Sequence, residues 1–256
     1  MGMMSNLVKD DQILLDDGFY FGRGVFETIL LRDGKAILLL YHLKRLNESL
    51  QLLGIDKYIT AEYVYNKIEE LKYTNGALKI MVSEKNTIFT VRDIPYGNED
   101  YEKGFSLKVS SVLRNETSLN TYIKSFAYYE NLIEKKKAKN LGFQETLFLN
   151  TKSFITECST SNIFFINNNK ICTPKIQCGI LNGTVRKFLL NELKKDYDFE
   201  EGEYTIDNLY NSQGIFITNS LLGIMKVNKV NEHKIDEHTD IFDIKEKYEK
   251  LIENYK

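Results

Sequence analysis

Residues 156–186 constrain the fold of this chain more than any other stretch of the sequence. The run TECSTSNIFF at 156–165 joins a lone acid, Glu157, to a β-rich segment. The run TPKIQCGILNGTVR at 173–186 follows, and its Asn-Gly-Thr sequence predicts the start of a helix. The stretch therefore connects a carboxylate at a strand end to a helix that opens at a glycine turn.

Two chemical features of this stretch suit opposite ends of one cofactor. A carboxylate such as that of Glu157 is the partner that a pyridinium nitrogen requires. Backbone N–H groups at a helix N-terminus, here those of Gly183, Thr184 and Val185, bind phosphate. Together they predict pyridoxal 5'-phosphate as the cofactor, although Asn-Gly-Thr before a helix is by itself common capping chemistry.

Charge and cysteine content exclude several other classes of function. The chain has 34 basic and 36 acidic residues, so we expect a small-molecule substrate rather than nucleic acid or a membrane as its partner. Three cysteines and three histidines without metal-ligand spacing predict a reduced protein with no metal site. The first residues form no apolar signal segment, and the longest apolar run, at 36–41, is too short to cross a bilayer. We therefore expect a cytoplasmic protein.

Hydrophobic periodicity predicts an α+β (mixed α/β) fold of two domains. In the first half we expect a hairpin of strands at 25–31 and 36–41, helices at 42–53 and 59–71, and strands at 78–83, 87–91 and 105–109. In the second half we expect helices at 130–140, 185–195 and from about 241, and strands at 145–149, 161–166 and 215–218. The polar run around 113–120 has the composition of a linker. It predicts a small N-terminal domain at 1–113, a linker at 114–120 and a larger cofactor-binding domain at 121–256.

Seven short motifs give this chain a resemblance to the class IV pyridoxal-phosphate enzymes of fold type IV, over nearly its whole length. In chain order they are FGRGVFET at 21–28, HLKRL at 42–46, IKS at 123–125, TECSTSNIF at 156–164, TP at 173–174, GTVR at 183–186 and TNSLLGIMKV at 218–227. The resemblance implies a fold like that of the D-amino-acid and branched-chain aminotransferases. It also implies a homodimer, with pyridoxal phosphate in the cleft between the two domains.

The same resemblance implies roles for individual residues. Lys124 matches the lysine that holds the cofactor as a Schiff base and then moves protons at the substrate carbon. Glu157 matches the acid at the ring nitrogen. Tyr129 matches a tyrosine at the cofactor's phenolic oxygen, although core packing explains it nearly as well. The phosphate would be bound by Arg45, Gly183, Thr184, Val185 and Ser220.

The expected reaction depends on residues 218–227, which resemble the pattern of the aminodeoxychorismate lyases. Asn219, Leu221 and Leu222 are bulkier than the turn of the aminotransferases, and no arginine-containing carboxylate trap follows the strand at 78–83. The resemblance implies conversion of 4-amino-4-deoxychorismate to 4-aminobenzoate and pyruvate, a step of folate biosynthesis. A class IV aminotransferase for D-alanine or branched-chain amino acids is the first alternative, and a non-catalytic binding protein that kept the fold is the second.

Four residues are candidates for substrate binding. Asn219 offers an amide to a ring-bearing substrate, and Arg23, Arg92 and Lys226 are cations that suit a substrate carboxylate. Surface exposure explains each of the three cations more simply than a function does. The positions of their side chains in the fold therefore matter for choosing among them.

Overall fold

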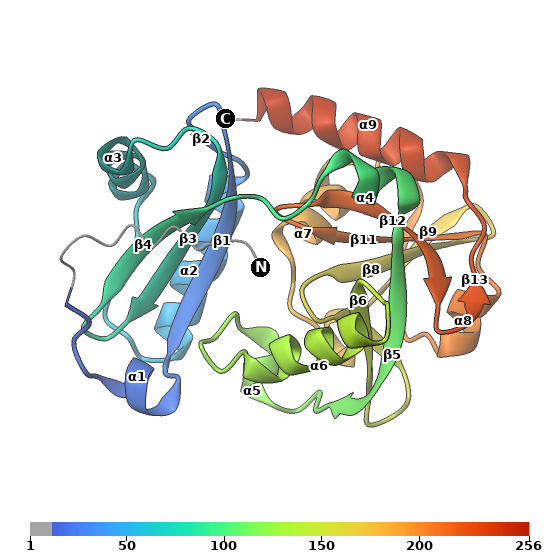
Figure 1. Cartoon of the computed structure of the whole chain (residues 1–256), viewed down its shortest axis with the longest axis horizontal. Coiled ribbons are helices and arrows are strands. Elements are labelled where there is room, and N and C mark those ends of the chain that lie inside the picture. The colour runs from blue at the N-terminus through green and yellow to red at the C-terminus, as the bar shows by residue number, and fades with distance from the viewer. Residues whose placement is uncertain (1–11, 256) are drawn as a thin grey trace. The chain divides into compact units, whose positions relative to one another are not determined.

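Two compact units make up the chain in the computed structural model, which describes residues 12–255 (Figure 1). The first unit contains residues 12–95, Ile123–Tyr128 and Tyr255, and the second contains Tyr96–Tyr122 and Tyr129–Asn254. Each unit has a sheet of its own. The expectation drawn from the first residues of the chain lies outside the described residues.

The division between the units differs from the sequence prediction, which placed it at 114–120. The chain passes from the first unit to the second after Pro95, and Ile123–Tyr128 return to the first unit. Residues 113–120 contain the end of strand β5 (Phe105–Arg114) and the start of helix α5 (Leu119–Tyr122), both in the second unit. The run is polar because it turns at the surface, and a surface turn has the same composition as a linker.

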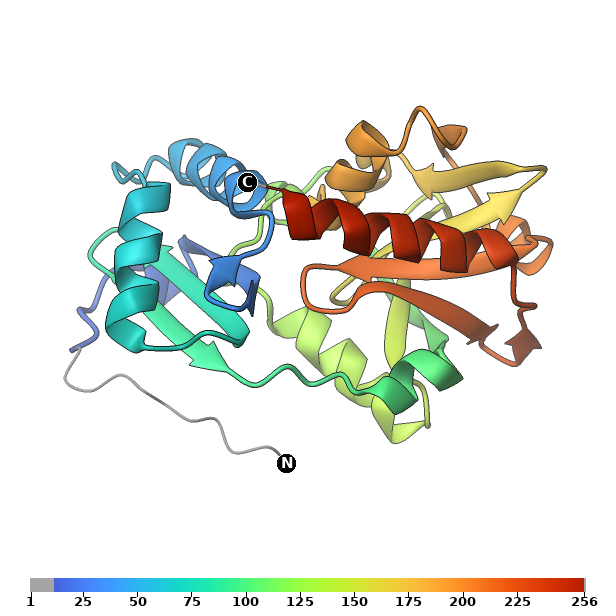
Figure 2. The same cartoon turned by 90° about the horizontal axis from the view of Figure 1, so that it is seen from above.

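A four-stranded antiparallel sheet forms the first unit, in the order β2-β1-β3-β4. Its strands are β1 (Gly24–Arg32), β2 (Lys35–Ala36), β3 (Gly76–Ser83) and β4 (Thr87–Arg92), and helix α1 (Asp17–Phe21) precedes them. Helices α2 (Leu39–Leu52) and α3 (Ala61–Leu71) cover one face of the sheet (Figure 2). Every second residue of β1 and β3, such as Ile29 and Leu78, is buried against these helices. The intervening residues lie on the opposite face.

The predicted second strand of the hairpin, at 36–41, is wrong beyond its first residue. Strand β2 ends at Ala36, and α2 begins at Leu39 after Leu38, which has a left-handed backbone conformation (φ 54°). A short apolar run fits a buried strand or a buried helical turn equally well, and packing of Leu39 into the core favours the helix. The other helices and strands predicted for the first half are present.

Residues 124–126 add a short edge to the sheet of the first unit. The amide of Phe26 donates to the carbonyl of Lys124 (2.8 Å), and the amide of Phe126 donates to the carbonyl of Gly24 (2.9 Å). These two bonds flank a single antiparallel bridge. Since β2 pairs with only the far end of β1, the near end is paired by this segment instead. The backbone of Lys124 is thereby fixed beside β1.

A nine-stranded mixed sheet forms the second unit, in the order β10-β9-β8-β11-β12-β5-β6-β7, with β13 paired to β12. The pairs β9/β10, β5/β12 and β5/β6 are parallel and the others antiparallel. Besides β5, the strands are β6 (Glu145–Asn150), β7 (Ile155–Cys158), β8 (Asn162–Asn167), β9 (Lys170–Pro174), β10 (Phe199–Gly202), β11 (Gly214–Asn219), β12 (Gly223–Val230) and β13 (His233–Lys234).

The helices of the second unit pack around this sheet. Besides α5, they are α4 (Asn98–Lys103), α6 (Tyr129–Asn140), α7 (Thr184–Glu192), α8 (Ile206–Tyr210) and α9 (Thr239–Asn254). Helix α9 runs along β11 and β12 (Figure 2), and α7 also contacts β11. The helices and strands predicted for the second half are present, and the mixed α/β fold class is confirmed. Within residues 12–255, no helix combines the length and the apolar character that a bilayer crossing requires.

Candidate active site

Lys124 lies against two aromatic rings of the first unit. Its Nζ is 4.6 Å from the ring centre of Phe26 and 5.0 Å from that of Tyr128. The two rings meet edge to face, with their centres 5.3 Å apart. Cation–π attraction therefore positions the end of the lysine side chain, while the backbone bonds to β1 fix its start.

A buried carboxylate lies on β1, next to the residue that contacts Lys124. Glu27 is 1% exposed, and its Oε1 and Oε2 accept hydrogen bonds from Nε (2.7 Å) and Nη2 (2.6 Å) of Arg45. His42 Nδ1 lies 2.7 Å from the same Oε2. Because Arg45 and His42 are three residues apart on α2, both reach the same side of the helix. Glu27 thus orients the guanidinium that the sequence predicts to bind phosphate.

The charges of this cluster follow from burial and proximity. Burial opposes ionisation of Glu27, but Arg45 and His42 outweigh this effect and lower the pKa of the carboxyl to about 2. Burial lowers the pKa of His42, and the charges of Arg45 and Lys124 add to the decrease, against the opposing effect of Glu27. At neutral pH Glu27 is therefore a carboxylate and His42 a neutral ring. A carboxylate only accepts hydrogen bonds, so Nδ1–H of His42 donates to it.

The sheet face opposite the helices carries a second lysine close to Lys124. Lys79 of β3 pairs with Thr28 of β1, so it shares a face with Phe26, two residues earlier on β1. Its Nζ lies 4.6 Å from the ring centre of Phe26. Burial, together with the charge of Arg92, lowers the pKa of Lys79. Sequence reasoning missed Lys79 because only the pairing of β1 with β3 brings it to this face.

Glu157, at the end of β7, is the buried acid of the second unit. It is 8% exposed, and its Oε2 accepts hydrogen bonds from Asn162 Nδ2 (3.3 Å) and from the backbone amide of Leu181 (3.1 Å). Both bonds go to the same oxygen and hold it in place. A buried acid suits a ligand with a basic nitrogen, and this role of Glu157 stays a prediction.

The predicted phosphate-binding turn is the start of helix α7. Gly183 is the residue before the helix, and no side chain caps the first turn. A Cβ atom on Gly183 would lie 1.9 Å from Asn162 Oδ1, so only glycine fits there. The side chains of Thr184 and Val185 are buried, at 4% and 1% exposure. The turn therefore presents backbone rather than side chains at the helix N-terminus, as phosphate sites do.

The turn between β11 and β12 carries Asn219 and Ser220. Asn219 Oδ1 accepts hydrogen bonds from the amides of Leu221 and Leu222 (2.9 Å each), and Nδ2 donates to Ser161 Oγ (3.1 Å). This side chain holds the turn in shape. Ser220 lies in the same turn and is partly buried. The substrate role of Asn219 and the phosphate role of Ser220 stay predictions.

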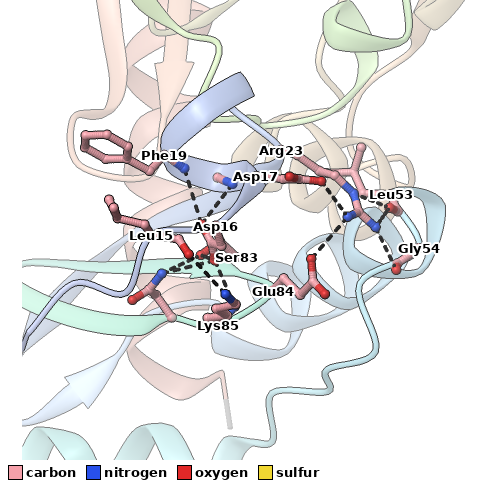
Figure 3. A network of polar contacts seen from close by, with 12 residues as sticks. Leu15, Asp16, Asp17, Phe19, Arg23, Leu53, Gly54, Ser83, Glu84 and Lys85 are labelled. Atoms are coloured by element: carbon pink, nitrogen blue, oxygen red, sulfur yellow. Dashed lines mark hydrogen bonds and ion pairs between the residues drawn. The ribbon is translucent and has the colours of Figure 1, made fainter.

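The side chain of Arg23 forms hydrogen bonds and ion pairs with other residues of the first unit (Figure 3). Its Nε and Nη2 bond the carbonyl of Leu53 (3.1 and 3.0 Å), and Nη2 also bonds the carbonyl of Gly54 (3.0 Å). Its Nη1 contacts the carboxylates of Asp17 (3.2 Å) and Glu84 (3.4 Å). The guanidinium thus binds carbonyls at the C-terminal end of α2, where a cation is favoured. This geometry favours a stabilising role, while its substrate role stays a prediction.

Three further predicted residues have weaker structural support. Lys226 of β12 forms an ion pair with Glu237. Arg92 is exposed, and its Nη1 donates to the carbonyl of Asp93 (3.2 Å), although its place on β4 puts it on the face of Lys79. Tyr129 is 70% exposed, so the alternative explanation by core packing is wrong. The roles of all three stay predictions.

The predicted residues fall into two groups. In the first unit, β1 connects Lys124, which lies over Phe26, to Arg45, which is bound by Glu27. In the second unit, the start of strand β8 contacts three predicted sites. Asn162 bonds Glu157 and packs against Gly183, and Ser161 accepts a hydrogen bond from Asn219.

Pyridoxal phosphate fits the donors and acceptors of the second group. Glu157 suits a ring nitrogen, and the uncapped start of α7 suits a phosphate. In addition, the hydroxyl of Thr218 is buried and has no hydrogen-bond partner among the described residues. Thr218 pairs directly with Asn162, whose side chain packs against Gly183, so the side chains of Thr218 and Asn162 lie on the same face of the sheet. A buried polar group without a partner is rare, and a bound ligand would satisfy it.

The fold and these groups of residues define an enzyme of the aminotransferase class. The family model described as amino-transferase class IV matches residues 24–230, and the chain belongs to this family.

Similar proteins carry two different activities in their names. The chain is 28% identical to an aminodeoxychorismate lyase of Bacillus subtilis, over 85% of this chain and 80% of that protein. It is also 28% identical to a putative branched-chain-amino-acid aminotransferase of Methanocaldococcus jannaschii, over 89% of this chain and 86% of that protein. Among solved structures, a putative 4-amino-4-deoxychorismate lyase of Legionella pneumophila has a TM-score of 0.86 at 25% identity, covering 97% of both chains. The comparisons therefore support the family without choosing between the activities.

Proposed function

We propose that this protein is a pyridoxal-phosphate-dependent lyase that converts 4-amino-4-deoxychorismate to 4-aminobenzoate and pyruvate. The observation that carries this proposal is the presence of two further cations, Lys79 and Arg92, on the sheet face that bears Lys124. The proposed substrate has two carboxylates, as has the keto acid 2-oxoglutarate, whereas D-alanine and the branched-chain amino acids have one. Cations on the face of the proposed reactive lysine suit a substrate that carries two carboxylates, and Lys79 lies over the same ring as Lys124.

Each group of residues would contribute one part of the reaction. Pyridoxal phosphate supplies a ring that withdraws electrons from the substrate carbon next to the amine. Glu157 would keep the ring nitrogen protonated, and Arg45 with the start of α7 would bind the phosphate. Lys124 would take the proton from C4 of the substrate as the bond between C3 and the enolpyruvyl oxygen breaks. The ring then becomes aromatic, and the released enolpyruvate takes up a proton to give pyruvate.

Product analysis tests the proposed reaction. Purified protein loaded with pyridoxal phosphate should release 4-aminobenzoate and pyruvate in equal amounts from 4-amino-4-deoxychorismate, without any keto acid. A lyase needs no amino-group acceptor because its cofactor returns unchanged in each turnover. Coupled lactate dehydrogenase would measure pyruvate, and fluorescence would measure 4-aminobenzoate. Absence of both products from cofactor-loaded protein would contradict the proposal.

An aminotransferase acting on D-alanine or branched-chain amino acids is the second candidate. The Methanocaldococcus jannaschii relative supports it as strongly as the Bacillus subtilis relative supports the lyase, because the two are equally identical to this chain. Lys124, Glu157 and the phosphate site would serve either reaction. Amino-group transfer from these amino acids to 2-oxoglutarate or pyruvate, in the absence of lyase products, would decide for the aminotransferase.

Substitutions of Lys79 and Arg23, two cations of the first unit, should have different effects on KM and on stability. Lys79→Met removes a charge near Lys124, so the KM for the anionic substrate should rise about tenfold or more with little change in kcat. Arg23→Lys should leave KM unchanged and lower the free energy of unfolding by about 1 kcal/mol, because lysine cannot bond both carbonyls at the end of α2 in the same way. Steady-state kinetics and chemical denaturation measure the two effects. A raised KM in Arg23→Lys, with unchanged stability, would instead make Arg23 the substrate residue.

The quaternary state and the location of the protein stay predictions. A homodimer is expected from the family resemblance, and a cytoplasmic location from the composition of the sequence. Multi-angle light scattering of the purified protein measures its mass in solution directly. A monomeric mass for the active, cofactor-loaded protein would contradict the expected homodimer.

A further inference from the structure

Asn162, the first residue of β8, lies between two parts of the second unit that the proposed function assigns to opposite ends of the cofactor. It is 5% exposed, and its Nδ2 donates to Glu157 Oε2 (3.3 Å) and to the carbonyl of Leu181 (2.8 Å). The amide of Leu181 in turn donates to the same Glu157 oxygen (3.1 Å). The acid, the asparagine amide and the backbone of residue 181 therefore form a closed triangle of hydrogen bonds.

The other end of the asparagine side chain packs against the glycine turn. Asn162 Oδ1 occupies the space in which a Cβ of Gly183 would lie, at 1.9 Å from that ideal position. Residues 181–183 lead directly into the first turn of α7, which no side chain caps. One buried side chain thus bonds the acid on one side and supports the approach to the helix N-terminus on the other.

We propose that Asn162 is a positioning residue that couples the orientation of the Glu157 carboxylate to the shape of the phosphate-binding turn. A bridge of this kind makes the two ends of the ligand bind to one rigid unit. Burial strengthens the bridge, because an amide that is removed from water, bonded twice through Nδ2 and packed at Oδ1 has few other conformations. The proposal concerns binding and depends on the proposed use of pyridoxal phosphate.

The coupling can be measured with two ligands that differ only at one end. Pyridoxal has the ring of pyridoxal phosphate without the phosphate, so comparing the two separates effects at the ring from effects at the phosphate. Dissociation constants would be measured on cofactor-free protein by the change in visible absorbance as each ligand binds. Wild type, Asn162→Ala, Glu157→Gln and Asn131→Ala would be compared. Asn131 is a matched control, since it is a buried asparagine of the same unit that bonds the Ser159 carbonyl (2.7 Å).

Asn162→Ala should weaken pyridoxal binding about tenfold and pyridoxal phosphate binding by a clearly larger factor, because both ends of the ligand lose their alignment. Glu157→Gln should weaken both ligands by the same factor, since it changes only the ring end. Asn131→Ala should change neither constant. Equal losses for both ligands in Asn162→Ala would mean that Asn162 serves Glu157 alone, and loss for pyridoxal phosphate only would mean that it serves the turn alone. Either result overturns the coupling.

Folding and the proposed function are checked separately. The circular dichroism spectrum of cofactor-free Asn162→Ala should match that of wild type. If the two spectra differ, Asn162→Ser, which keeps a small polar group, is measured in place of Asn162→Ala. A lower unfolding temperature with unchanged dissociation constants would show a purely structural role and overturn the proposal. If wild type itself binds neither ligand, the proposed cofactor is wrong. If wild type binds both and Asn162→Ala binds them equally well, only the inference about Asn162 fails.

Discussion

Lys124→Ala is expected to lower kcat/KM by about a thousandfold or more, the largest effect on activity of any single substitution in this chain. In the proposed mechanism Lys124 both attaches the cofactor and moves the proton, so the substitution would remove both functions, and general acid–base catalysis alone contributes a factor of about a hundred to ten thousand. The visible absorbance that a covalently attached cofactor gives should disappear as well. Single-turnover assays and absorption spectra of the purified variant measure the two consequences.

Two control variants separate chemistry from structure at this position. Lys124→Arg keeps a positive charge over Phe26 but cannot attach the cofactor or give up its proton, so it should be as inactive as Lys124→Ala. Lys44→Ala, on the exposed surface of α2, should retain wild-type activity and spectrum. Activity above a tenth of wild type in either Lys124 variant would show that another residue performs the chemistry.

Glu27→Ala should cost the most stability, about 3–5 kcal/mol of unfolding free energy. It leaves Arg45 without its bidentate partner and the buried ring of His42 without its acceptor. Replacing both partners of a buried ion pair costs less than removing one, so Glu27→Ala/Arg45→Met should be more stable than the sum of its single variants predicts. Urea denaturation of the cofactor-free proteins measures the difference. Additive losses would show that Glu27 and Arg45 do not depend on each other.

The cluster of Glu27, Arg45 and His42 should make the free energy of unfolding depend on pH in the acidic range. The folded-state pKa of Glu27 is lowered from its usual value of 4.5 to about 2, so the unfolded chain takes up this proton first as the pH falls. The stabilisation is therefore complete above pH 4.5 and is lost between pH 4.5 and about 2. In Glu27→Gln this part of the decrease should be absent. Asp16, whose pKa is also lowered to about 2, affects both proteins alike, so the difference between their denaturation curves isolates Glu27.

Local sequence was sufficient to predict the position of residues that belong to short motifs. The acid at Glu157 and the glycine turn at Gly183 belong to short motifs, and the structure gives Glu157 a buried position at a strand end and Gly183 the place before α7. The helical spacing of Leu43, Leu46 and Leu50 likewise predicted α2, because one face of a helix repeats every three to four residues.

Sequence was insufficient where a role depends on which strands pair. Lys79 reaches the face of Phe26 only through the register between β3 and β1, and Asn162 reaches Glu157 and Gly183 only when β8 follows β7 closely and α7 returns to it. Arg23 and Asn219 were chosen for their chemical type. In the structure the side chains of both residues form hydrogen bonds with backbone groups of this chain. Residue type alone does not predict such bonds.

The pairing of residues 124–126 with β1 has a consequence for how the protein can be divided and assembled. The first unit is not a continuous piece of polypeptide, because residues 12–95 are completed by a segment that is synthesised only after strand β5. A fragment ending at Pro95 would leave the near end of β1 as an open edge, ready to pair with another chain. During synthesis, the near end of β1 likewise stays unpaired until Lys124 has left the ribosome. Lys124, the proposed reactive lysine, is thus among the last residues to join the first sheet.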